Sequence, residues 1–104
     1  MNMLNSIILE GDICKLNELS EAEKTLEFNI QVARTYRDAS GKLVTEAPSF
    51  IITANGNLAV CAASKAREGR GVRVVGRLIE SDGKVKVFAE HIEFKPEKPK
   101  KKEA

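Results

Sequence analysis

The sequence contains no tryptophan, one tyrosine, one histidine and only two cysteines in 104 residues. Cys14 and Cys61 are not spaced like metal ligands, so reduced, buried and inert thiols are expected rather than a disulfide or a zinc site. No apolar run approaches the roughly 20 residues that span a bilayer, and the first residues lack the basic region and cleavage site of a signal peptide. The sequence therefore predicts a cytoplasmic protein without a metal or other cofactor.

The residue groups that an active site needs are also missing. The sequence has no Cys/His pair, no phosphate-binding glycine loop and no carboxylate pair placed beside a predicted pocket. Its single histidine, His91, falls in a predicted strand, where a lone histidine is usually structural. We therefore predict a protein that is not an enzyme.

Residues 50–78 form the unit around which the rest of the fold is predicted: a strand, a short helix and a second strand. An aromatic and β-branched run indicates the first strand, and apolar residues at helical spacing follow Asn57, which is expected to cap the helix. Gly69 and Gly71 are expected to end the helix, because glycine enters the left-handed C-terminal conformation without steric cost. The stripe of the helix that faces inward is predicted to be Leu58, Cys61, Ala62 and Lys65.

Further segments carry strand patterns. Residues 4–14 alternate around Gly11, a glycine expected to bend the strand so that it serves both sides of a small barrel. Residues 26–33 alternate strictly, residues 34–45 form a long hairpin, and residues 84–94 form the last strand after a Ser-Asp-Gly turn. The inward residues are predicted to be Ile7, Leu9, Ile13, Leu26, Phe28, Ile30, Val32, Phe50, Ile52, Ala54, Val72, Val74 and Leu78. The outward residues include Ile51, Thr53, Phe88, Ile92 and Phe94, of which Phe88 and Phe94 are expected to pack against a subunit or the end of the barrel.

A single small helix between the third and fourth strands favours a five-stranded Greek-key barrel whose helix covers one end. The alternative is an unrelated α+β sandwich. The length predicts one domain, residues 1–94. Residues 95–104 are rich in lysine and proline, and we predict a disordered tail there.

Charge is distributed unevenly along the chain. The net charge is +2, but residues 1–94 hold 12 Lys and Arg against 13 Asp and Glu, and the tail holds five lysines against two glutamates. Within the predicted barrel, basic residues concentrate between the helix and the last strand. This asymmetry allows a phosphate-binding stripe, and an ordinary solvated surface is the alternative.

Four groups of motifs resemble the bacterial single-stranded DNA-binding protein family, and the resemblance covers residues 4–94. They are residues 5–11, residues 28–38 with their Phe-x-Ile-x-Val-Ala-Arg and Tyr-Arg-Asp pieces, residues 56–59 and residues 71–78. The primosomal replication protein N branch, a shorter dimeric relative, shares similar motifs, so the branch stays open.

The resemblance implies an OB-fold that assembles as a dimer or tetramer and wraps single-stranded DNA. Such binding uses aromatic faces for base stacking, worth roughly 1 to 3 kcal/mol per base, and Lys and Arg side chains for phosphates. By resemblance, Tyr36 stands at a stacking position, whereas Ser49 and Asn55 stand where the family commonly has Trp and Phe. The lysine-rich tail replaces the family's acidic C-terminal peptide. These departures predict weaker DNA binding and no recruitment of partners through an acidic peptide.

The leading hypothesis is a sequence-independent single-stranded DNA-binding protein of DNA replication, recombination or repair. We expect a nucleoid-associated homo-oligomer with replication proteins as further partners. The alternative is an OB-fold protein-interaction module with weak DNA binding, whose interface contains Ile51, Phe88 and Ile92. The DNA-binding residues are predicted to be Tyr36 for stacking and Arg34, Arg37, Lys42, Arg73, Arg77, Lys84 and Lys86 for phosphates.

Overall fold

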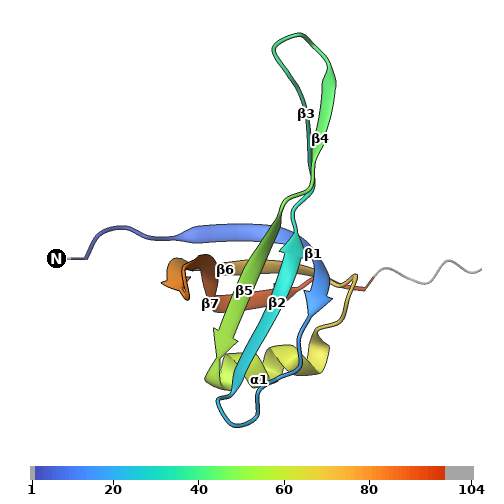
Figure 1. Cartoon of the computed structure of the whole chain (residues 1–104). Helices are drawn as coiled ribbons and strands as arrows, with labels where there is room; N and C mark the ends of the chain where they lie inside the picture. Colours follow the sequence, from blue (N-terminus) through green and yellow to red (C-terminus); the bar gives the residue numbers. More distant parts are fainter. Residues whose placement is uncertain (1, 98–104) are drawn as a thin grey trace, which may run out of the picture.

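The computed structural model describes residues 2–97. Strands and one helix follow each other in this part of the chain, as Figure 1 shows. They are β1 (Ile7–Leu16), β2 (Thr25–Gln31), β3 (Arg34–Arg37), β4 (Leu43–Glu46), β5 (Ser49–Asn55), α1 (Gly56–Lys65), β6 (Gly71–Ser81) and β7 (Lys84–Phe94). Within residues 2–97, no helix has the length and apolar character needed to cross a membrane.

Five of the strands close into a barrel in the order β1-β2-β5-β7-β6, and β3 and β4 form a separate hairpin. Neighbouring barrel strands are antiparallel except β5 and β7, which run parallel. Helix α1 lies at one end of the barrel (Figure 1) and contacts β2, β5 and β7. Along the chain it lies between the third and fourth barrel strands, which are β5 and β6 once the hairpin strands are numbered. The predicted five-stranded barrel with one short helix is confirmed.

Strand β1 serves both sides of the barrel, because its residues 7–12 pair with β6 and its residues 12–16 pair with β2. Gly11 lies close to the point where the strand changes partner. A Cβ atom on Gly11 would lie 2.3 Å from the carbonyl oxygen of Gln31, so only glycine allows the two backbones to come this close. The predicted use of β1 by both sides of the barrel is confirmed, while the irregularity in its pairing lies beyond Gly11, between Ile13 and Lys15.

The core is a set of aliphatic side chains and one aromatic ring that the strands and α1 contribute from all sides. The strict alternation of β2 is confirmed, since Leu26, Phe28 and Ile30 are buried, and Val32 is half-buried just beyond the strand. A slip by one residue would bring these side chains into water, so the core holds β2 in register. The buried hydrophobic residues are Ile13, Leu26, Phe28, Ile30, Ile52, Ala54, Ala59, Ala62, Val72, Val74, Val87 and Ala89.

Helix α1 begins earlier than the sequence indicated. Asn55 occupies the N-cap position without a side-chain hydrogen bond, so the prediction that Asn57 caps the helix is wrong. Gly56 has a φ of +64°, which turns the chain directly out of β5, and its N–H donates to the carbonyl oxygen of Lys24 at 2.8 Å. A backbone contact with a distant loop therefore sets the start of the helix.

The side of the helix that faces inward also differs from the prediction. Ala59 and Ala62 are buried, whereas Cys61 and Lys65 are exposed, so the predicted stripe is wrong at these two exposed positions. Cys14 on β1 is exposed as well, and its thiol donates to a backbone carbonyl. The prediction of two buried thiols is therefore wrong.

The helix ends before the two glycines that were expected to end it. Its last residue is Lys65, and Ala66 follows in an extended conformation. Gly69 does have a left-handed φ of +91°, but it lies in the turn that leads to β6. The glycine therefore shapes the loop after the helix and not the helix end itself.

Strand β7 changes its inward side part-way along its length. The register between β6 and β7 shifts opposite Gly76 and leaves Glu90 as an extra residue, which is a β-bulge. Ile92 and Phe94, beyond the bulge, pack against the core, whereas Phe88 lies between two buried residues and faces outward. The prediction that these three residues share one outward side is wrong for Ile92 and Phe94.

Three residues lie on the predicted side of their strands, as their pairing shows, but their exposure differs from what that side indicates. Phe50 is 37% exposed because it lies next to the start of the hairpin, and Leu78 is 43% exposed because it lies beyond Gly76, where the pairing of β6 with β1 ends. Thr53 is buried, since β5 has a paired neighbour on each side at this position. The alternation of apolar and polar residues within one strand does not show how far neighbouring strands cover a side chain.

Gly76→Ala is expected to lower the free energy of unfolding by about 2 to 3 kcal/mol. The new Cβ would lie 2.0 Å from the carbonyl oxygen of Phe88, a backbone atom that cannot move aside. Denaturant unfolding followed by circular dichroism measures the effect. Gly71→Ala is the control, because its Cβ would first meet the flexible side chain of Lys95, at 3.2 Å. Equal stability of the two variants would contradict the role of Gly76.

Candidate nucleic-acid interface

The predicted DNA-binding residues fall into two groups in the structure. One group lies on the β3–β4 hairpin, which extends away from the barrel in Figure 1, and the other lies on β6 and β7. The hairpin group is Arg34, Tyr36, Arg37 and Lys42, and the second group is Arg73, Arg77, Lys84 and Lys86.

Tyr36 is held at the side of the hairpin by two neighbours. Its hydroxyl donates to Oε1 of Glu46 at 2.9 Å, and the guanidinium of Arg34 lies 5.7 Å from the centre of its ring. The hydrogen bond to the Glu46 carboxylate raises the pKa of Tyr36, and the negative charge of that carboxylate adds to the effect. The ring remains 36% exposed, so it is oriented and still open to a stacking partner.

The tip of the hairpin is organised by Asp38. Its Oδ1 atom accepts hydrogen bonds from the N–H and Oγ of Ser40 and from the N–H of Lys42, at 2.7 to 2.9 Å. These hydrogen bonds lower the pKa of Asp38, with the Ser40 side chain as the largest cause. Arg37 donates from NH1 to the carbonyl oxygen of Gly41 at 2.9 Å. Arg37 and Lys42 are therefore carried on an ordered turn.

A second pair of an arginine and an aromatic ring lies on the barrel. The guanidinium of Arg77 lies 4.9 Å from the centre of the Phe88 ring, and the two residues pair across β6 and β7. Phe88 also pairs with Thr53 on β5, which in turn pairs with Glu27 on β2. The pair therefore belongs to one outer surface that spans β2, β5, β7 and the adjoining part of β6, here called the β2–β5–β7 face.

The β2–β5–β7 face leads to the hairpin, because β2 and β5 are the two strands that continue into β3 and β4 (Figure 1). Thr53 and Ser49 are four residues apart on β5, which corresponds to about 13 Å along a strand. The side chains between the two groups are mostly polar and small. They are Asn29, Gln31, Ser49 and Ile51.

Two of the predicted cations already have carboxylate partners. Arg73 donates from Nε and NH2 to Oε2 of Glu10 at 3.2 and 2.9 Å, and Lys86 lies 2.9 Å from Oε2 of Glu27. The Lys86 side chain is only 16% exposed, so it is less available to a ligand than its sequence position indicated. Arg34, Arg37, Lys42, Arg77 and Lys84 form no ion pair within residues 2–97.

Phe88 was predicted to pack against a subunit or the end of the barrel, and the structure makes it a candidate for DNA binding instead. The sequence does contain a pattern that places Phe88 beside Arg77. Asp82 and Gly83 both have positive φ and form the two-residue turn of the β6–β7 hairpin. Counting back from this turn pairs Arg77 with Phe88, and residues that face each other directly across two strands lie on the same side of the sheet.

The whole barrel and its hairpin fall inside one family match. Residues 4–94 match the family described as the Single-strand binding protein family. The chain belongs to this family. The resemblance noted in the sequence is confirmed, and a single-stranded DNA-binding protein is the function that the family supports. No curated protein matches the sequence.

Solved structures of single-stranded DNA-binding (SSB) proteins share the fold at low identity. A small single-stranded DNA-binding protein from Streptomyces coelicolor has a TM-score of 0.70 and 22% identity, over 90% of this chain and 95% of that one. A Plasmodium falciparum SSB in complex with ssDNA has a TM-score of 0.73 and 21% identity, over 92% and 98%. A deletion mutant of the Thermus aquaticus protein has a TM-score of 0.75 and 23% identity, over 89% of this chain and 51% of that one.

Glu46→Gln is expected to lower the pKa of Tyr36 toward the ordinary value for tyrosine, because the carboxylate that disfavours the tyrosinate is removed. An alkaline titration of ultraviolet absorbance reports this residue alone, since the chain has one tyrosine and no tryptophan. Glu80→Gln, on β6 and away from the hairpin, is the control and should leave the titration unchanged. A titration of Glu46→Gln that overlays the wild type would mean that Glu46 does not hold the ring.

Proposed function

We propose that the protein binds single-stranded DNA without sequence preference, through the hairpin and the β2–β5–β7 face. The observation that carries this proposal is the presence of two partly exposed aromatic rings, Tyr36 and Phe88, each beside an arginine that has no ion pair within residues 2–97. Aromatic faces stack bases of any kind, and neighbouring guanidinium groups attract the phosphates. Membership of the family supports the same ligand.

The proposed surface explains why binding should be weaker than on a surface built from several aromatic residues. Ser49 and Asn55 are exposed on β5 and offer no ring to a base. Each missing base–aromatic stack lowers the binding free energy by roughly 1 to 3 kcal/mol. Phe88 and Tyr36 remain as the stacking residues of the proposal, with Lys42 and Lys84 as further contacts to phosphates.

This function requires binding and no chemical step, so we propose a non-enzymatic protein. Because its ligand is DNA, we place it in the cytoplasm, associated with the nucleoid, in replication, recombination or repair. Replication proteins are the further partners of this proposal.

The Lys/Pro-rich tail, residues 95–104, was predicted to be disordered. Its residues 98–104 lie outside the described part of the chain, and residues 95–97 lie against the barrel.

The protein is expected to bind labelled oligo-dT at low salt, to bind duplex DNA of the same length more weakly, and to lose affinity as salt rises. The slope of log K against log salt should be about −0.7 per phosphate contacted. Emission from Tyr36 should be quenched on binding, and Tyr36→Ala should weaken binding about tenfold, as one lost base stack predicts. Fluorescence anisotropy measures the affinity.

Two arginines of β6 offer a matched comparison in the same titration. Arg77→Ala should weaken binding about fivefold, because Arg77 has no carboxylate partner within residues 2–97 and stacks on Phe88. Arg73→Ala should have a smaller effect, because Arg73 must first leave Glu10. No binding of the wild type at low salt would contradict the proposal and favour a protein-interaction module.

We also propose that the protein is a homo-oligomer, a dimer or tetramer, that assembles through β1. Residues 7–11 of β1 pair with β6 on one edge, and no strand within residues 2–97 pairs with the other edge. Ile8 on this segment is 65% exposed. A free strand edge pairs readily with a second copy of itself across a two-fold axis, and such a contact would cover Ile8.

Ile8→Lys is expected to lower the molar mass in solution from a multiple of the chain mass to that of the monomer, because two copies would place like charges in the contact. Analytical ultracentrifugation measures the mass. Leu43→Lys, at a similarly exposed position on the hairpin, is the control and should keep the wild-type mass. An unchanged mass in Ile8→Lys would exclude this edge as the contact.

A further inference from the structure

A pocket of about 400 Å³ lies where the loop after α1 meets the end of β7. Two backbone hydrogen bonds hold this loop on β1. The N–H of Gly69 donates to the carbonyl oxygen of Ile13 at 2.7 Å. The N–H of Ile13 in turn donates to the carbonyl oxygen of Arg70 at 2.9 Å. The pocket is thus built on a fixed part of the barrel. Its charged lining residues are Asp12, Arg67, Glu68, Arg70, Lys95 and Glu97.

Arg70 is the most firmly positioned cation in this pocket. Its Nε donates to the carbonyl oxygen of Lys95 at 2.9 Å, and its guanidinium lies 5.3 Å from the centre of the Phe94 ring. Its side chain is only 16% exposed. The orientation of the guanidinium therefore does not depend on the carboxylate that it also contacts.

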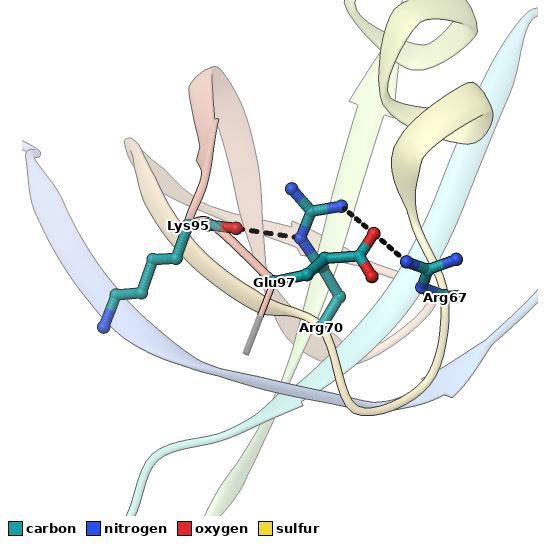
Figure 2. Close-up of polar contacts among 4 residues, drawn as sticks. All are labelled: Arg67, Arg70, Lys95 and Glu97. Carbon is teal, nitrogen blue, oxygen red and sulfur yellow. Dashed lines mark hydrogen bonds and ion pairs between the residues drawn. The ribbon is translucent and has the colours of Figure 1, made fainter. Parts of the chain in front are cut away.

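Glu97 places one carboxylate oxygen between two arginines, as Figure 2 shows. Its Oε1 accepts from NH1 of Arg70 at 3.2 Å and also forms an ion pair with NH2 of Arg67. Glu97 is half-exposed and Arg67 is more exposed still. Exposed ion pairs contribute roughly 0 to 1 kcal/mol, so a competing anion can displace this carboxylate.

The charge of the pocket depends on Glu97. With Glu97 in place, the three cations are balanced by three carboxylates, because Asp12 and Glu68 also line the pocket. Lys95 is itself bound to Glu10, at 2.7 Å. When Glu97 leaves, the pocket loses one negative charge: Arg70 keeps its orientation through Lys95 and Phe94, and Arg67 is released from its carboxylate partner.

The pocket lies close to the base of the hairpin around the barrel. Gln31, at the end of β2, pairs with Asp12 on β1, and Asp12 pairs with Gly71 at the start of β6. Adjacent strands are about 4.8 Å apart, so two steps correspond to about 10 Å. A nucleic-acid strand that leaves the hairpin can reach the pocket over this short distance.

We propose that Arg67 and Arg70 form a further phosphate-binding site, which takes a backbone phosphate of the strand leaving the hairpin, and that Glu97 fills this site in the free protein. A phosphate oxygen accepts hydrogen bonds from two guanidinium groups as the Glu97 oxygen does, and such charge-assisted bonds are strong. The inference rests on the proposed function, because it extends the path of the same DNA strand.

Glu97→Gln in the full chain tests this site. It should bind oligo-dT about fivefold more tightly than the wild type at low salt, the upper end of what an exposed ion pair contributes. Its salt slope should be steeper by about 0.7, for one more phosphate contact. Glu90→Gln removes the same charge from an exposed position of β7 and should change neither quantity. Adding Arg67→Gln to Glu97→Gln should restore the wild-type affinity and slope.

A second measurement uses inorganic pyrophosphate and needs no binding of DNA. The amide NMR signals of Gly69 and Gly71 should shift saturably with pyrophosphate in Glu97→Gln and stay unchanged in the Arg67→Gln Glu97→Gln variant. If the wild type binds oligo-dT but Glu97→Gln behaves like Glu90→Gln, the inference is overturned and the proposed function stands. If pyrophosphate binds but oligo-dT binding gains nothing, a nucleic-acid ligand for this site is excluded. If no variant binds oligo-dT, both the proposed function and this assignment fail.

Discussion

Close contact between backbones at two glycines is the constraint on which the barrel depends. Gly11 lies against the carbonyl oxygen of Gln31, and Gly76 lies against that of Phe88, at distances that leave no room for a Cβ atom. The first contact allows β1 to pass from β6 to β2, and the second accompanies the register shift between β6 and β7. A five-stranded barrel of this size closes only if its strands bend and shift in this way.

The register shift in β7 also determines which of its aromatic and aliphatic side chains face outward. It directs Ile92 and Phe94 into the core and leaves Phe88 on the outer face, where it meets Arg77. The hairpin repeats this arrangement independently, with Tyr36 beside Arg34. Two arginine-aromatic pairs, one on the hairpin and one on the barrel, are suited to a flexible chain of bases and phosphates, because neither contact reads the identity of a base.

Some cations of the protein form ion pairs with carboxylates of the barrel, and others do not. Glu10 holds Arg73 and Lys95, and Glu27 holds Lys86. The arginines and lysines of the hairpin, together with Arg77 and Lys84, have no such partner within residues 2–97. A nearly neutral protein thereby presents several unpaired cations on the hairpin and on the adjoining ends of β6 and β7, and this local charge is more relevant to an anionic ligand than the net charge is.

The sequence alone determined what depends on local spacing: the core side of β2, the bounds of β7, the turn at Asp82 and Gly83, and the barrel with its one helix. It also supplied the family, because the motifs lie in order along residues 4–94. Tertiary structure alone decided the bulge at Glu90, the burial of Thr53, the exposure of Cys61 and every ion pair of the barrel, such as Arg73 with Glu10, which are 63 residues apart. The physical reason is that these features depend on which strands become neighbours, and hydrophobic alternation within one strand carries no record of its neighbours.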